Sequence, residues 1–154
     1  MSTQQQKTVV EPQLMTKFEF ASPEWIAALR ERLEYYTAKE GPGLELSLCE
    51  VFTGVPKHLD KHGNGIIAWH CIIKNGKVHF EETAIPEADV RTEVDYTFVL
   101  PLARKVYSPD AMHEVEEMTA KGVASGKMKP TGRDRSKVPP SFVGMHNDLA
   151  ERTL

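Results

Sequence analysis

Residues 66–82, IIAWHCIIKNGKVHFEE, decide the fold of this chain. The Asn75-Gly76 pair in the middle predicts a two-residue hairpin turn, because Asn and Gly tolerate the positive φ angles that such a turn requires. The turn sets the register of the two strands. The expected cross-strand pairs are Lys74 with Lys77, Ile73 with Val78, Ile72 with His79, Cys71 with Phe80, His70 with Glu81, and Trp69 with Glu82. One face is apolar and the other mixed, which indicates an antiparallel sheet with one covered and one wet face.

A helix before this hairpin can supply the cover. Ser22 is a good N-cap, and Pro23 follows it at the first helical position, where a missing N–H costs nothing. The apolar stripe of this helix contains Trp25, Leu29 and Leu33, and Gly41 to Gly43 stop it. Before the helix, residues 1–17 are polar and aperiodic, which predicts a disordered or extended lead-in.

Three more strands are expected. Residues 44–53 alternate between apolar and polar, with a predicted bend where Cys49, Glu50 and Val51 break the alternation. Residues 88–95 alternate again. A short strand within 126–132 points Met128 inward, and Pro130 either makes it an edge strand or ends it. The connection over residues 54–65 is expected to be an exposed loop.

From Tyr96 onward the apolar period changes to that of a helix. Pro101 predicts that this helix begins within residues 97–100 or is kinked there. A second helix, capped by Asp110 and ended by Gly122 and Gly126, presents Met112, Val115 and Met118 on one face. Residues 139–154 form a C-terminal helix or lid that begins at Ser141 and carries Met145. The predicted fold class is α+β: a mainly antiparallel five-stranded sheet with helices covering one face, in a single domain over residues 18–154.

Composition excludes several classes of function. A net charge of −3 and a pI near 6.1 lack the basic footprint of a nucleic-acid binder, and no apolar run is long enough to span a membrane. The first residues lack the apolar core of a secretory signal, so we expect a cytoplasmic protein. Cys49 and Cys71 have no metal-site spacing, and we expect free thiols.

Three stretches resemble, in this order, the sterol carrier protein 2-like (SCP2-like) domain family: FASPEWIAALRERL (20–33), ADVRTEVDYTFVLPLARKVY (88–107) and SGKMKPTG (125–132). The resemblance implies a five-stranded sheet whose helices enclose a tunnel for sterols, fatty acids or acyl-CoA esters. It also implies that the C-terminal segment can lie over the tunnel mouth. The tail over 139–154 and the histidine-rich β-region depart from the plain carrier.

Carried onto this chain, the resemblance implies a ligand-binding wall. Its residues would be Trp25, Leu29, Leu33, Phe98, Leu102, Met112, Val115, Met118 and Met128. Met145 joins Met112, Met118 and Met128 at predicted inward positions. Methionine is flexible and polarizable, so it suits a cavity for varied apolar shapes, and it equally suits the filling of core gaps.

Catalytic chemistry has one candidate pair. His70 faces Glu81 across the hairpin, and a carboxylate beside an imidazole orients it as a general acid or base requires. A cross-strand ion pair on the wet face explains the same residues. Asp95, at the end of the fourth strand, is a further candidate carboxylate.

No metal or cofactor is expected. His58, Asp60 and His62 lie in a segment with Pro56, Gly63 and Gly65, which favours a solvated loop over a metal site, and no spacing supplies further ligands. A basic set near the C-terminus could bind the phosphates of a CoA ester or form a solvated rim. Its members are Lys127, Lys129, Arg133, Arg135 and Lys137.

Three hypotheses remain open at this point. The first is a domain that binds a lipid-like small molecule or acyl-CoA in an apolar cavity. The second is an enzyme that uses the same cavity for an apolar substrate. The third is a non-catalytic interaction domain, which could be a homodimer.

Overall fold

The computed structural model describes residues 16–154. The lead-in predicted for residues 1–17 therefore lies, apart from residues 16 and 17, outside the described part. The main elements follow the predicted order: α1 Pro23–Glu40, β1 Leu46–Thr53, β2 Ile66–Lys74, β3 Lys77–Glu81, β4 Val90–Asp95, α2 Tyr96–Arg104, α3 Met112–Ser125, β5 Met128–Pro130 and α4 Phe142–Ala150. Short 3-10 helices lie at Lys57–Leu59 (η2), Pro109–Ala111 (η3) and Arg135–Lys137 (η4).

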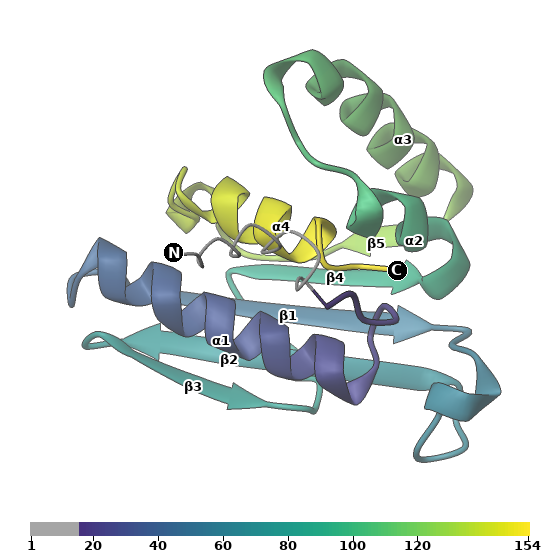
Figure 1. The fold of residues 1–154 in the computed structure, drawn as a ribbon, viewed down its shortest axis with the longest axis horizontal. Helices are drawn as coiled ribbons and strands as arrows, with labels where there is room; N and C mark the ends of the chain where they lie inside the picture. Colours follow the sequence, from purple (N-terminus) through teal and green to yellow (C-terminus); the bar gives the residue numbers. More distant parts are fainter. Residues whose placement is uncertain (1–15) are drawn as a thin grey trace, which may run out of the picture.

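The five strands form one sheet in the order β3-β2-β1-β4-β5. Three neighbouring pairs are antiparallel, and β1 with β4 is parallel. This confirms the predicted α+β class with a mainly antiparallel sheet. Helices α1 and α4 lie side by side over one face of the sheet, and α3 packs beside the edge strand β5 (Figure 1).

The hairpin β2–β3 has the predicted register from Lys74–Lys77 to His70–Glu81. Asn75 and Gly76 take φ angles of 54° and 76°, as the turn requires. Within the described hairpin, β3 ends at Glu81, so the predicted Trp69–Glu82 pair is not part of the ladder.

The predicted bend in β1 is wrong. β1 pairs with β2 without interruption from Leu46–Ile73 to Thr53–Ile66. Because the strand is regular, Glu50 shares a face with Leu48 and Phe52, the face that the helices cover. The polar residue in the apolar pattern is therefore an inward-facing carboxylate and not a bulge.

The predicted wet face of the sheet is also partly covered. The connection from β3 to β4 crosses behind β2 and β1, where Ile85 and Ala88 pack against the buried Cys49 and Val51. This crossing brings β4 beside β1 in parallel orientation. Both cysteines are free thiols, as predicted, and both are buried.

The predicted helix caps are confirmed only in part. The Ser22 hydroxyl accepts a hydrogen bond from Trp25 N at 3.2 Å, as expected for an N-cap. The cap predicted for Asp110 is wrong, because Asp110 lies inside η3 and Ser108 caps that turn. Helix α3 runs through Gly122, where the Phe98 ring occupies the space of a Cβ, and ends at Gly126 with φ 78°.

Residues 139–154 are docked onto the fold. Phe142, Leu149 and Thr153 are buried, and the Trp25 indole N–H donates to Thr153 Oγ1 at 3.1 Å. Ser141 stands at the N-cap position of α4, but its hydroxyl donates to Glu40 Oε2 at 2.7 Å.

Candidate ligand-binding cavity

A cavity of about 390 Å³ lies between the helix-covered face of the sheet and the helices. This volume is in the range of about 300–1,000 Å³ that small-molecule sites occupy. Arg135 and Val143 belong to its wall and are exposed, so the cavity reaches the surface between η4 and α4.

The wall is mostly apolar because each strand presents alternate side chains to the covered face. The sheet contributes Leu48, Phe52, Trp69, Val90, Val94 and Met128, and the helices contribute Trp25, Leu29, Val99, Leu102, Ala103, Phe142, Val143, Met145 and Leu149. The side chains of α4 thus form one wall of the cavity. A ligand inside would contact chiefly hydrocarbon and aromatic surface.

Glu50 is the acidic residue on this apolar wall. Its Oε1 accepts a hydrogen bond from the Trp69 indole Nε1–H at 3.0 Å, and the two residues are cross-strand partners. Burial raises the pKa of the Glu50 carboxyl, although the Trp69 hydrogen bond and the charge of Arg135 act against this shift. The carboxyl group is therefore easier to protonate than an exposed glutamate.

Tyr107 and His146 form a second polar part of the wall. Their rings stack with centroids 3.7 Å apart. His146 Nε2 lies 2.8 Å from the carbonyl oxygen of Lys105, so Nε2 carries the proton and donates it in this hydrogen bond. Burial lowers the pKa of this imidazole, although the hydrogen bond to Lys105 acts in the other direction. Burial, together with the charge of Glu50, raises the pKa of Tyr107 to about 12. Both rings are therefore neutral near pH 7.

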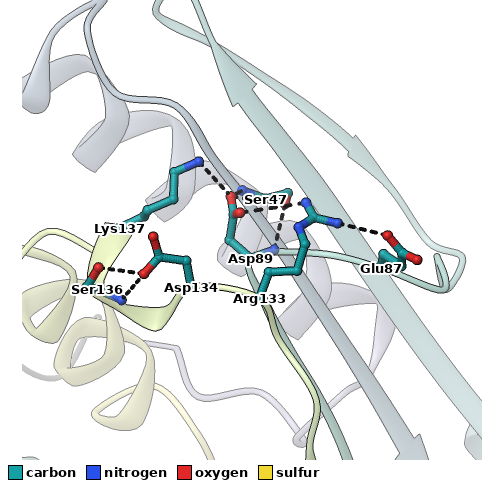
Figure 2. A network of polar contacts seen from close by, with 7 residues as sticks. All are labelled: Ser47, Glu87, Asp89, Arg133, Asp134, Ser136 and Lys137. Atoms are coloured by element: carbon teal, nitrogen blue, oxygen red, sulfur yellow. Dashed lines mark hydrogen bonds and ion pairs between the residues drawn. The ribbon is translucent and has the colours of Figure 1, made fainter.

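The segment after β5 carries Arg135 to the cavity. Asp89 holds this segment through Arg133 and Lys137 (Figure 2). Asp89 Oδ1 lies 3.6 Å from Arg133 Nη2, and Oδ2 lies 3.4 Å from Lys137 Nζ. Oδ2 also accepts hydrogen bonds from Ser47 N at 2.8 Å and from the Ser47 hydroxyl at 3.2 Å. Two cations of the predicted basic set are thus paired with a buried carboxylate.

Five of the ten predicted ligand-binding residues are on the cavity wall: Trp25, Leu29, Leu102, Met128 and Met145. Leu33 and Val115 are buried away from it, and Phe98 packs against the core and Gly122. Met118 on α3 is partly buried outside the wall. The inward position predicted for Met112 is wrong, because this side chain is exposed at the start of α3.

The predicted catalytic residues lie away from the cavity wall. His70 is on the opposite face of the sheet, buried, with Nδ1 2.6 Å from Thr83 O. Glu81 faces it in the backbone register, but its carboxylate lies 3.3 Å from His79 Nε2. Asp95 Oδ2 accepts from Phe98 N and caps α2.

Glu50, Tyr107 and His146 were not predicted as site residues. Glu50 did leave a signal, since it interrupts an otherwise apolar face of β1. Tyr107 and His146 meet only through the docking of α4, where Asn147 bonds both the N–H and the carbonyl of Tyr107, and no periodicity reveals this contact.

Two further features concern residues 16–154 as a whole. They contain no helix with the length and hydropathy of a membrane span. In the same residues, no group of three or more acidic, histidine or cysteine side chains is arranged to hold a metal ion.

The chain has an SCP2-like fold by comparison with solved structures. A conserved hypothetical protein of Thermus thermophilus, described as a possible sterol carrier protein, matches 88% of this chain and 92% of its own at 15% identity, with a TM-score of 0.52. The fold assignment rests on this match. A crystal structure of sterol carrier protein 2 covers 86% of this chain and 92% of its own (15% identity, TM-score 0.45). A structure of palmitated SCP2L2 from Aedes aegypti covers 82% of this chain and 94% of its own (12% identity, TM-score 0.35). No family model and no curated protein matches the sequence.

Proposed function

We propose, from the SCP2-like fold and the cavity beneath its helices, that this protein binds a lipid-like ligand such as a sterol, a fatty acid or an acyl-CoA ester. The observation that carries the proposal is the volume of about 390 Å³ behind a wall of apolar and aromatic side chains. A mainly apolar pocket with a few polar groups is the usual form of a site for an apolar small molecule.

Burial of hydrocarbon would drive the binding. Each buried CH₂ contributes about 0.8 kcal/mol, so affinity should rise roughly fourfold per added carbon until the cavity is full. Tryptophan fluorescence can follow this directly, since both tryptophans of the chain, Trp25 and Trp69, are on the wall. A series of straight-chain lipids should therefore change the emission with a length-dependent affinity that reaches a plateau.

A cavity-filling variant tests the location. Ala103 is a partly buried wall residue of α2, and Ala103→Phe would occupy ligand space. Ala120→Phe, on the exposed surface of α3, is the matched control. We expect Ala103→Phe to abolish or strongly weaken binding and Ala120→Phe to bind like the wild type. Equal binding by all three proteins would place the ligand elsewhere and contradict the proposal.

A further inference from the structure

We infer that Glu50 makes this cavity selective for ligands whose polar end donates a hydrogen bond, such as a long-chain alcohol, over ligands that end in a carboxylate. The inference rests on the proposed function, because it assigns a polar specificity to the same cavity.

Glu50 lies in the middle of the cavity floor. In the sheet it stands between Trp69 of β2 and Thr92 of β4, and all three are wall residues. The apolar Leu48 and Phe52 flank it along β1 on the same face. A ligand that fills this cavity must therefore lie against the carboxyl group.

Within residues 16–154, one oxygen of this carboxyl group has no hydrogen-bond donor. Oε1 accepts from Trp69 Nε1, whereas no group of residues 16–154 donates a hydrogen bond to Oε2. If a purely apolar part of a ligand covered Oε2, the oxygen would lose water without gaining a hydrogen bond, and this carries the desolvation penalty of a buried polar group. A ligand hydroxyl placed there would remove the penalty.

A ligand that ends in a carboxylate is disfavoured beside Glu50. Two carboxyl groups in one poorly solvated site cannot both remain ionised, so its binding requires the uptake of a proton. An alcohol has no such requirement. The affinity for a carboxylate should therefore fall with rising pH, while the affinity for an alcohol of equal length should change less.

The other titratable side chains of the wall do not supply a buried positive charge in place of that proton. Tyr107 and His146 are neutral near pH 7, because burial raises the pKa of Tyr107 and lowers that of His146. The Cys49 thiol points to the opposite face, where Sγ lies 3.8 Å from Ile85 O. Arg135 is cationic and lowers the pKa of the Glu50 carboxyl, but it is exposed at the mouth and its effect is smaller than that of burial.

The test compares 1-dodecanol with dodecanoate by tryptophan fluorescence at about pH 6 and pH 8. Three proteins are used: the wild type, Glu50→Gln, and Glu45→Gln at an exposed position just before β1 as a matched control. Glu50→Gln has nearly the same shape and keeps an oxygen for Trp69, but it can turn an N–H donor toward the cavity.

In the wild type at pH 8 we expect 1-dodecanol to bind at least about tenfold more tightly than dodecanoate, which corresponds to one buried hydrogen bond. Glu50→Gln should reduce this ratio to near one or reverse it, and Glu45→Gln should leave it unchanged. The wild-type ratio should shrink between pH 8 and pH 6, a readout that does not depend on how well the variant folds.

The inference is overturned if wild-type protein binds dodecanoate as tightly as 1-dodecanol at pH 8, or if a folded Glu50→Gln variant keeps the wild-type ratio. Either result leaves lipid binding intact. If neither ligand binds any of the three proteins, the proposed function fails instead, and the inference fails with it.

Discussion

Replacement of Asp89 by Asn should destabilise the protein through the segment that carries Arg135 to the cavity. Asp89 joins the start of β4 to Ser47 of β1 and to Arg133 and Lys137 around η4 (Figure 2). Burial opposes ionisation of Asp89, but the Ser47 N–H and the Lys137 ammonium outweigh this effect, and the pKa of the carboxyl is lowered. Asn keeps the shape and loses the charge.

The expected magnitude follows from these contacts. Each of the two hydrogen bonds from Ser47 loses about 1 kcal/mol when its acceptor becomes neutral. The side chains of Arg133 and Lys137 are 53% and 40% exposed, so their two ion pairs add no more than about 1 kcal/mol together. A total of about 2–3 kcal/mol corresponds to a fall in Tm of roughly 4–12 °C for a chain of this size.

Thermal unfolding at neutral and acid pH measures this effect. A group whose folded pKa is lowered stabilises the fold above its unfolded pKa, and this contribution is lost as the pH falls through the folded value. The difference in Tm between wild type and Asp89→Asn should therefore be full at neutral pH and shrink in acid. Trypsin should also cut the variant faster after Arg133, Arg135 or Lys137, because the segment is held less firmly.

Glu87→Gln is the matched control, since Glu87 also pairs with Arg133 but its side chain is 77% exposed. It should change the Tm much less than Asp89→Asn does. The reasoning is refuted if Asp89→Asn melts at the wild-type temperature at neutral pH, or if its deficit persists unchanged in acid.

Three other predictions concern the segment after β5, the core and the cavity wall. Gly132→Ala should lower the Tm and speed trypsin cleavage after Arg135, because its Cβ would lie 2.6 Å from Val90 Cα, whereas Gly43→Ala has free space and should be neutral. Leu33→Ala should cost about 2–5 kcal/mol in urea unfolding. It should leave the ligand affinity of the folded protein unchanged, because Leu33 is fully buried outside the cavity wall. The pKa of Glu50 in the folded protein is raised above the ordinary glutamate value of 4.5. The folded protein therefore loses stability as the pH rises from 4.5 through the folded pKa, where Glu50 becomes ionised. Glu50→Gln should therefore melt above the wild type at about pH 8 and match it at about pH 4. An equal difference in Tm between Glu50→Gln and the wild type at both pH values would contradict a raised pKa for Glu50.

Local signals predicted the framework of the fold. The Asn75-Gly76 turn and the two-residue period of its strands determine the hairpin register, and Ser22 with Pro23 marks the start of α1. These features depend on neighbouring residues alone. The sequence therefore contains enough information to place them.

The features that depend on packing between distant segments were not predicted. The burial of His70 depends on the β3–β4 connection, which crosses the outer face of the sheet, and an alternating strand does not show what covers that face. Glu50 was interpreted as a break in β1, because a carboxylate on an apolar face is uncommon without a ligand or a partner. Met112 has helical spacing with Val115, yet the start of α3 leaves it exposed.

Native mass spectrometry of the purified protein, followed by organic extraction, tests lipid binding in the cavity most directly. Wild type and Ala120→Phe should each carry one lipid-like molecule per chain, or take one up from an added lipid, and Ala103→Phe should carry none. If the wild type stays empty in the presence of a panel of sterols, fatty acids, alcohols and acyl-CoA esters, and its Tm is unchanged by all of them, the cavity is not a lipid site.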